Sequence, residues 1–197
     1  MRFSLKPPDP KLQVTLETER FILRPCSTLE ILRDPGDWRT NPNIYRNVYF
    51  RSTPMGLAGW LKWGPFPDGR RRFTFAIIPK GTSTVIGYHA VRRQGWQTAV
   101  NTVGIHNATW LGKHAAVEVR IKLMNHFFRN GGIHRFTARI EATNHPSIFT
   151  YRKLGYRHVG TLHRERADPE TGKPVDYLLF EMLKVHWKRG PFAEPDL

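Results

Sequence analysis

The stretch that begins near Asn101 and ends at Tyr156 constrains the fold most strongly, because its hydrophobic periodicity changes twice. An alternating segment, TAVNTVGIH, leads into the turn NATWLGKHA, and the helical pattern AVEVRIKLMNHFF follows. A second strand, FTARIEA, and a second helix, NHPSIFTYRKLGY, complete the stretch. A helix that connects two strands of one sheet crosses over that sheet, so these two strands are expected to be parallel. The order predicts a mixed α/β domain.

The turn before the first of these helices is a candidate anion site. It contains Gly112, and the helical pattern starts at Ala115. The first turn of a helix leaves backbone N–H groups unpaired at the positive end of the helix dipole. This arrangement favours phosphate, so the sequence predicts a phosphate-bearing cofactor at this turn.

The helix itself has apolar residues at Val117, Ile121, Met124 and Phe128, which predicts a single stripe facing a sheet. The segment Asn130-Gly131-Gly132 is expected to end it.

The flanking segments predict the rest of the sheet. Strands around 71–80, 82–91 and 97–106, with turns at Lys80-Gly81 and Gln94-Gly95, indicate an antiparallel meander. Residues 157–168 and 174–187 predict a closing hairpin. The expected fold has about seven mostly antiparallel strands with one parallel splayed pair, and about four helices flank the sheet. Residues 1–14 are interpreted as an N-terminal lead, 15–188 as a single domain and 189–197 as a C-terminal tail.

The charge balance indicates an anionic partner. There are 31 Lys and Arg against 16 Asp and Glu, which gives a formal net charge of +15. A cofactor with several phosphates, an acidic protein segment or RNA would suit such a surface. The basic residues are scattered along the chain, so a basic solubility surface remains the alternative.

Other sequence features narrow the class of protein. Cys26 is the lone cysteine, which excludes an intramolecular disulfide and fits the cytoplasm. No apolar run resembles a signal peptide or a membrane span, so no membrane association is expected. The pairs His106/His114 and His158/His163 lack the spacing of known metal sites, and no metal is expected. Neither a P-loop nor a dinucleotide fingerprint occurs, which disfavours NTP hydrolysis and NAD use.

Three motifs, in this order, resemble those of one family. They are LETERFILRP near the start, NHPSIFTYRKLGYRHVGTLHR after the central stretch, and GKPVDYLLFEMLKVHW near the end. From about Leu16 to Trp187 the chain resembles the GCN5-related N-acetyltransferases (GNAT), particularly the branch of ribosomal-protein N-terminal acetyltransferases. The resemblance implies acetyl-CoA as cofactor and an amine as acceptor.

The resemblance also implies how the cofactor would be held. The turn and helix start would bind the pyrophosphate of coenzyme A through Gly112, Lys113, His114, Ala115 and Ala116. The chain departs from the family pattern there: Leu111 replaces a basic or amide residue, and His114 replaces a glycine. His114 is compatible with the site if its φ angle is negative. The backbone of Ile105 and His106 would pair with the pantetheine arm where the parallel strands splay apart.

The resemblance assigns the remaining candidates around the second helix. Asn144 and Ser147 are interpreted either as helix caps alone or as caps that also contact the cofactor. Tyr151 matches the position whose hydroxyl protonates the departing thiolate. Many relatives carry a basic carboxylate where this chain has Thr102, so Glu141 is the candidate general base. His106 and His89 are the alternative bases, and Glu118 is expected to stabilise or pack the helix start.

Three functions remain open at this stage. The first is an N-acetyltransferase that acts on a protein N-terminus or a small amine. The second is an acetyltransferase with an RNA-linked acceptor such as an aminoacyl-tRNA. The third is a non-catalytic protein that binds coenzyme A or nucleic acid. A homodimer through the closing strands is a further expectation.

Overall fold

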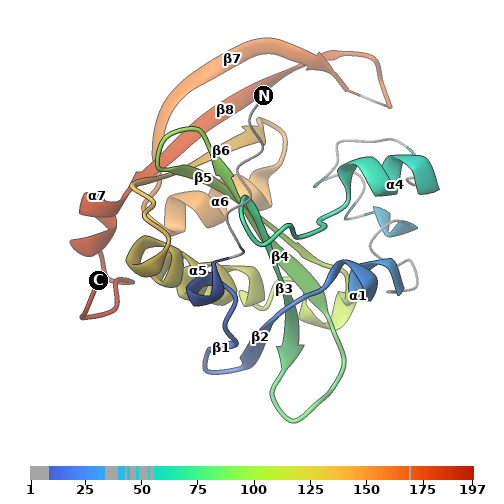
Figure 1. Ribbon diagram of the computed structural model, residues 1–197. Helices are drawn as coiled ribbons and strands as arrows, with labels where there is room; N and C mark the ends of the chain where they lie inside the picture. Colours follow the sequence, from blue (N-terminus) through green and yellow to red (C-terminus); the bar gives the residue numbers. More distant parts are fainter. Residues whose placement is uncertain are drawn as a thin grey trace, which may run out of the picture.

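The computed structural model describes residues 9–33, 40–42, 44, 48, 53, 56–168 and 170–197. One sheet of eight strands runs through this part of the chain in the order β1-β2-β3-β4-β5-β6-β8-β7 (Figure 1). The strands are β1 (Leu16–Glu17), β2 (Phe21–Pro25), β3 (Arg72–Pro79), β4 (Gly87–Gln94), β5 (Thr98–Ile105), β6 (Arg135–Glu141), β7 (Arg157–Ala167) and β8 (Pro174–Leu183).

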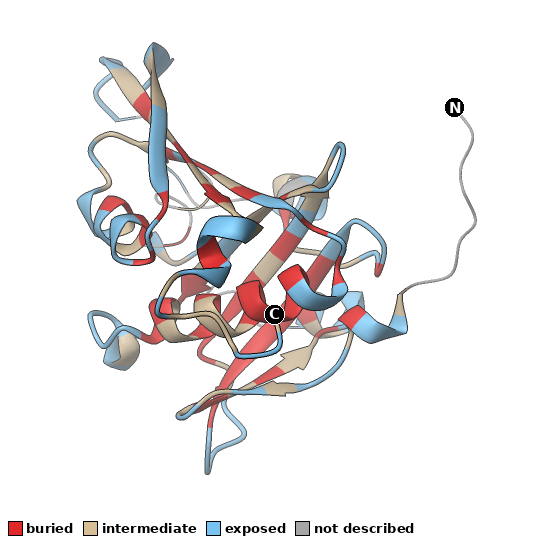
Figure 2. Cartoon of the chain, turned by 90° about the vertical axis from the view of Figure 1, so that its left-hand side faces the viewer, coloured by how far each residue is buried: buried red, intermediate tan, exposed pale blue. Residues whose placement is uncertain are grey.

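Helices cover both faces of the sheet. Those of the described residues are α1 (Thr28–Arg33), α4 (Leu57–Trp63), α5 (Ala115–Asn130), α6 (His145–Lys153) and α7 (Lys184–Lys188). The larger core cluster joins α5 and α6 to one face, and a smaller cluster gathers residues of α1 and α4 against the other. Figure 2 shows buried residues along the central strands and the helices packed on them.

The mixed α/β fold with one parallel pair is confirmed, with three corrections to its elements. The described part has eight strands and five helices, where about seven and about four were expected. The segment LETERFILRP forms a short hairpin and not one strand: β1 and β2 pair, with Leu16 opposite Leu23. The last strand stops at Leu183 because its partner β6 begins at Arg135, directly opposite, and the chain continues as α7.

The parallel strands β5 and β6 separate soon after they meet. They pair only at Thr98–Arg135, Ala99–Phe136 and Val100–Thr137. Both strands continue well beyond these pairs, so the sheet opens between their C-terminal halves. Beyond Val100 and Thr137, the facing edges of β5 and β6 are therefore not paired with each other.

Helix α5 is buried on more than the single predicted stripe. Leu123 is fully buried, whereas Ile121 of the predicted stripe is only half-buried. The C-terminal segment packs on the side of the helix away from the sheet. There Asn125 donates to the carbonyl of Phe192 at 2.8 Å and accepts from the indole of Trp187 at 2.7 Å. The pattern of apolar residues alone does not reveal this second contact, because Asn125 is polar.

Across the described ranges, no helix combines the length and apolar character needed to cross a lipid bilayer.

Candidate functional site

A cavity of about 370 Å³ lies between the start of α5, the free edge of β5 and the first turns of α6. Its lining residues come from these three elements and from the turn before α5: Val103, Ile105, Trp110, Leu111, Gly112, His114, Ala115, Ala116, Val117, Arg120, Pro146, Ser147, Phe149 and Thr150. Six of the nine residues predicted to hold a cofactor are among them.

Two left-handed residues shape the turn at the mouth of this cavity. Gly112 has φ +73° and His114 has φ +58°. The condition of a negative φ, under which His114 was expected to be compatible with the site, is therefore not met, since His114 forms the N-cap of α5 in the left-handed region. A non-glycine residue there costs about 1–2 kcal/mol, so packing around the turn must hold this conformation.

The left-handed turn leaves backbone donors at the helix start. The N–H groups of Val117 and Glu118 both donate to the carbonyl of His114, at 3.0 and 3.1 Å. Ala115 and Ala116 precede these bonds, so their N–H groups have no acceptor within the helix. Both residues line the cavity, which gives it two donors at the positive end of the helix dipole.

An arginine from the first hairpin fixes the turn in place. Arg20 donates through Nε to Glu118 at 2.7 Å and through Nη2 to the carbonyl of Lys113 at 3.0 Å. Burial alone would raise the pKa of the Glu118 carboxyl, but hydrogen bonds from Thr18 and Arg20 and the charge of Arg20 lower it overall. Glu118 is thus an anchor of the helix start, as expected, and Lys113 contributes a carbonyl to the same anchor.

The free edge of β5 faces the cavity with alternate residues. His106 N–H donates to the carbonyl of Ile86 at 2.9 Å, so His106 directs its backbone toward β4. The alternation of an antiparallel ladder then directs the backbone groups of Ile105 and Val103 toward the opening. The carbonyl of His106 accepts from Asn41 at 3.1 Å. Both backbone groups of His106 are therefore engaged away from the cavity, so His106 is not available to pair with the pantetheine arm as predicted. The residues of β5 whose backbone groups point toward the opening are Val103 and Ile105.

Tyr151 reaches the point where β5 and β6 separate. Its hydroxyl donates to the backbone carbonyl of Asn101 at 3.3 Å, with the side-chain oxygen of Asn101 at 3.4 Å. Asn101 is the first residue of β5 beyond its last pair with β6. The tyrosine is 6% exposed and packs edge-to-face on Tyr156 with centroids 4.8 Å apart. Its phenol group is therefore held at the opening by packing on Tyr156 and by the hydrogen bond to β5.

The two capping candidates on α6 have different positions. The side chain of Asn144 accepts from Ser147 N–H at 3.2 Å, which is the cap that the sequence predicts. Ser147 lines the cavity, whereas the Asn144 oxygen is used in the cap.

Glu141 ends β6 on the face of the sheet opposite to Tyr151. Alternation along β6 puts Phe136, Ala138 and Ile140 in the core, so Glu141 points to the other face. Its carboxylate accepts from Thr143 at 2.6 Å and from the hydroxyl of Tyr177 at 3.4 Å. Burial first, and then the charge of Glu141, raise the pKa of Tyr177.

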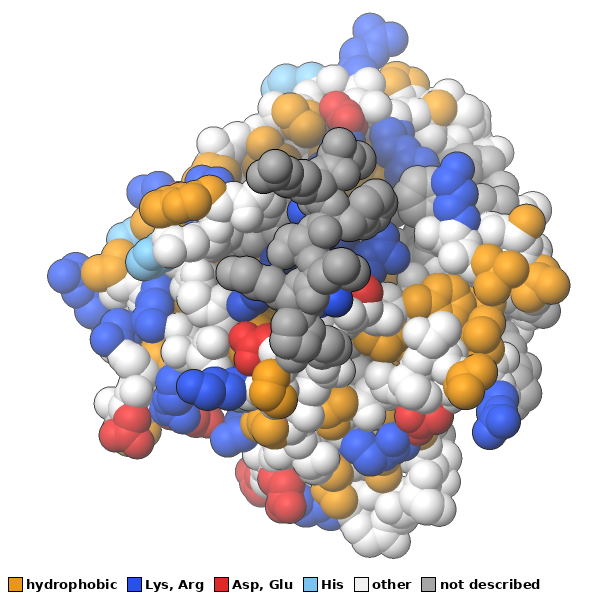
Figure 3. Space-filling view, viewed as in Figure 1, with side chains coloured by type: hydrophobic (Ala, Val, Ile, Leu, Met, Phe, Trp, Pro, Cys, Tyr) orange, Lys and Arg blue, Asp and Glu red, His pale blue; other side chains and the backbone are white. Residues whose placement is uncertain are grey.

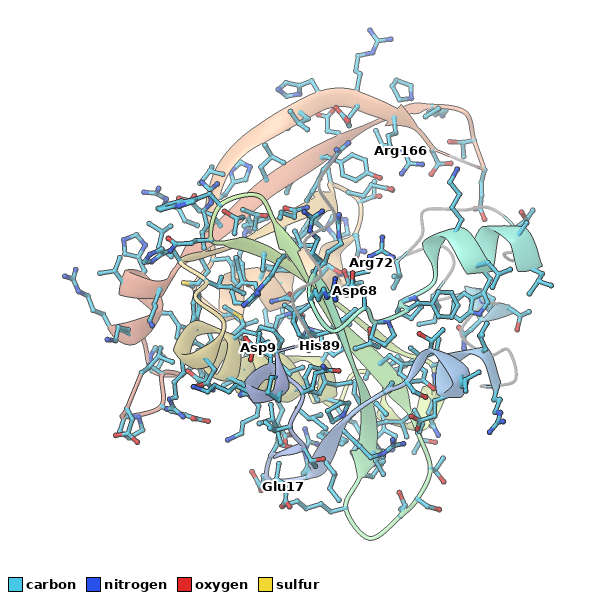
Figure 4. All side chains as sticks on the ribbon, in the orientation of Figure 1. Asp9, Glu17, Asp68, Arg72, His89 and Arg166 are labelled. Atoms are coloured by element: carbon cyan, nitrogen blue, oxygen red, sulfur yellow. The ribbon has the colours of Figure 1, made fainter. Side chains whose placement is uncertain are left out.

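A second cavity, of about 260 Å³, lies on this same face. It is lined by strand residues and by the end of α4: Val48, Gly64, Pro65, Arg72, Thr74, Ala90, Val91, Arg92, Val100 and Thr102. Arg72 and Arg92 are direct cross-strand partners. Figure 4 shows Arg72 beside Asp68, whose carboxylate accepts the backbone N–H of Arg72 at 2.8 Å. Thr102 lies in this cavity, where many relatives carry the carboxylate.

The sequence missed one polar residue of the first cavity. Arg120 is only 5% exposed and its guanidinium lies 4.5 Å from the ring centroid of Tyr151. Nearby His89 is fully buried, and burial first, then the charge of Arg120, lower its pKa well below the usual value. His89 is therefore a neutral core residue. An arginine within a helix normally predicts a solvated position, so the sequence held no signal for this site.

No group of three or more metal-ligating side chains occurs within the described ranges. The basic side chains on the face shown in Figure 3 are distributed over it and not gathered into one patch.

Comparison with known proteins identifies the family. A family model described as an acetyltransferase (GNAT) domain matches residues 20–157, and no curated protein matches the sequence. A GNAT acetyltransferase from Bacillus anthracis has a TM-score of 0.69 at 16% identity, over 87% of this chain and 99% of that one. The ribosomal-protein-S5-alanine acetyltransferase from Vibrio fischeri gives the same score and identity, over 89% of this chain and 99% of that one. The microcin C7 self-immunity acetyltransferase was solved with acetyl-CoA and AMP. It has a TM-score of 0.50 at 19% identity, over 57% of this chain and 61% of that one.

Proposed function

Because the chain belongs to the GNAT acetyltransferase family, we propose that it transfers an acetyl group from acetyl-CoA to a primary amine. The observation that carries this proposal is the hydroxyl of Tyr151 at the opening between β5 and β6, beside the cavity described above. One wall of that cavity offers helix N–H groups, and another offers an unpaired strand edge.

Coenzyme A has groups that suit each of these walls. Its pyrophosphate would accept from the N–H groups of Ala115 and Ala116, with help from the helix dipole. Its pantetheine amides would pair with the backbone of Val103 and Ile105, as an added strand does. Gly112, His114 and Ser147 border the same space. The bound cofactor supplies the activated acyl group, and the protein supplies its orientation.

The proton transfers require one acid and one base. Tyr151 donates its proton to the sulfur as the carbon–sulfur bond breaks, and solvent restores it afterwards. Glu141 accepts a proton from the amine, directly or through a water, as the carbon–nitrogen bond forms. The two residues face opposite sides of the opening, which matches a cofactor that enters from one face and an acceptor that enters from the other.

The acceptor side favours an amine that carries a negative charge. Like charges directly opposite each other on two strands are unfavourable, and Arg72 and Arg92 form such a pair beside a cavity. An anionic group between them would offset that repulsion. Two structurally similar proteins indicate the range of acceptors to consider: one is a ribosomal-protein-S5-alanine acetyltransferase, and another was solved with acetyl-CoA and AMP. A protein N-terminus of the ribosomal-protein type is our first choice, and an RNA-linked amine is the second.

Two measurements test the proposal. Titration calorimetry with coenzyme A should show binding at submillimolar concentration, and thiol release should occur with amines present. Binding without thiol release from any amine in a broad panel would favour a non-catalytic protein. Failure to bind coenzyme A would remove the proposed function altogether.

The acceptor class is tested by comparing amines with and without a phosphate or carboxylate group. Arg92→Met should raise KM for the anionic amines about two- to five-fold, as expected for a partly exposed ion pair, and leave the neutral ones unchanged. Steeply salt-dependent tRNA binding would favour the RNA-linked acceptor.

A further inference from the structure

Helix α5 carries an arginine whose surroundings differ from those of its basic neighbours. Lys122 and Arg129 both reach the carboxylate of Glu194 near the surface. Arg120 is 5% exposed, and no carboxylate among the described residues pairs with it. Its Nε is enclosed and has no hydrogen-bond acceptor in the described part of the chain. A buried cation without a counter-ion is unfavourable, so a negative charge in the adjoining cavity would be stabilised by Arg120.

The groups around Arg120 are neutral on every element that packs against it. On α6, the ring of Tyr151 lies 4.5 Å below the guanidinium. On β4, His89 is fully buried with both ring nitrogens unpartnered among the described residues, and its lowered pKa keeps it neutral. Before β7, burial raises the pKa of Tyr156 far above its usual value, so this phenol also stays protonated. Asn101 completes the cluster through its bonds to both tyrosines.

The position of Arg120 separates it from the phosphate-binding turn. It lies five residues after Ala115, which is about 7 Å further along the helix. It lines the cavity and stacks on the tyrosine that reaches the opening between β5 and β6. On the proposed function, this is the end of the cavity where the carbon–sulfur bond breaks.

We propose that Arg120 is a positioning residue for acetyl transfer, and that it acts through Tyr151. As the amine nitrogen bonds to the carbonyl carbon, the electron pair of the carbon–sulfur bond moves to sulfur. Tyr151 donates its proton to that sulfur and becomes a phenolate until solvent reprotonates it. The charge of Arg120, stacked on the same ring, stabilises the negative charge on the phenol oxygen and on the sulfur.

The test is the ionisation of bound coenzyme A, which does not require turnover. Unacetylated coenzyme A is bound to the protein, and thiolate formation is followed by its ultraviolet absorbance as pH rises. The wild-type protein should ionise the thiol at lower pH than free coenzyme A. Arg120→Met should raise the midpoint by about one pH unit, a ten-fold change in the ionisation constant. Arg120→Lys, which keeps the charge but not the planar stack, should raise it less.

Arg93→Met is the matched control. Arg93 lies over the ring of Phe73 at 5.7 Å and bonds to the carbonyl of Gly131, away from the cavity. Removal of this stacked charge should leave the midpoint unchanged.

Each contrary outcome has a distinct meaning. A midpoint unchanged in Arg120→Met, with coenzyme A still bound, would overturn the role of Arg120 and leave the proposed function intact. If Arg120→Met does not fold, the wild-type protein still provides a test. A midpoint of thiol ionisation in its complex at or above that of free coenzyme A would also overturn the role of Arg120. Absence of coenzyme A binding to the wild type would overturn both.

Discussion

On one side of the opening between β5 and β6, the cavity is formed by two helix starts and a free strand edge, which present backbone groups. On the other side, the cavity is formed by strand faces and the end of α4, and its polar groups are side chains such as Arg72, Arg92 and Thr102. A site that uses backbone groups depends on the fold and tolerates sequence change, so the proposed cofactor site is compatible with the departures at Leu111 and His114. A side-chain-lined site changes with each substitution. We therefore expect the cofactor side to be shared among relatives and the acceptor side to be particular to this protein.

The largest effect is expected at Tyr151, which lies at the opening between the two cavities. Tyr151→Phe removes the proposed acid and should lower kcat about 10²- to 10⁴-fold, while the Kd of coenzyme A stays within about two-fold. Steady-state kinetics and calorimetry measure these quantities. Tyr156→Phe is the control, because that buried hydroxyl also contacts Asn101, at 3.3 Å. Similar losses of kcat in both variants would indicate a packing role and not an acid.

The acceptor side is tested by Glu141→Gln. Loss of a general base should lower kcat/KM about 100-fold at neutral pH. Steady-state kinetics with the acceptor amines measure this loss. Glu181→Gln is the matched change on β8, where the carboxylate holds Arg157 at 2.6 Å. A Glu141→Gln variant that keeps the wild-type kcat/KM would exclude Glu141 as the base.

The cofactor side is tested by Ala116→Asp. A carboxylate in the first turn of α5 would repel a phosphate and should weaken coenzyme A binding at least about ten-fold. The same charge should raise the free energy of unfolding by about 0.3–1 kcal/mol, because it complements the helix dipole. Calorimetry and urea unfolding measure the two effects. Ala116→Asn, which has the same size and no charge, should retain most of the affinity. Unchanged affinity in the aspartate variant would place the phosphates elsewhere.

The anchor of the cofactor turn is tested by Glu118→Gln, which should affect stability more than chemistry. Loss of the charged hydrogen bonds from Arg20 should lower the free energy of unfolding by about 2 kcal/mol at neutral pH. The pKa of Glu118 is lower in the folded chain than the usual value of 4.5. The contribution of the Glu118 carboxylate to the free energy of unfolding is therefore present above pH 4.5 and is lost as pH falls through the pKa of the folded state.

The difference in free energy of unfolding between wild type and Glu118→Gln should accordingly shrink on acidification below pH 4.5. Urea unfolding at several pH values measures it. Glu17→Gln, at an exposed pair with Lys80, should change stability by less than about 1 kcal/mol. A pH-independent difference at Glu118 would show that packing, and not charge, is lost.

Periodicity explains why most of the sheet and the main helix could be predicted. The start of α5 at Ala115 follows from a glycine-containing turn that leads into a helical pattern. The parallel pair follows from the need for a crossover helix between two strands. The position of Tyr151 follows from its spacing to Asn144 and Gly155 within a recognisable motif. These features depend on residues close together in the chain.

Local pattern could not predict features that depend on distant contacts. The left-handed conformation of His114 needs Arg20 and Glu118, which tie the turn to the first hairpin. The backbone of His106 turns away from the cavity because Ile86 and Asn41 engage it. No spacing rule contains these partners.

The sequence by itself determined the order of strands and helices, the phosphate-favouring turn before α5 and the tyrosine on α6, because each is encoded by neighbouring residues. Only the tertiary structure decided that Tyr151 meets β5 where the parallel strands part, that Glu141 faces the opposite side, and that Arg120 is buried beside the cavity. The physical reason is burial. The local sequence pattern around a charged residue is the same whether water or a tyrosine ring surrounds its side chain. The packing of α5 between the sheet and the C-terminal segment determines whether the side chain is exposed or buried.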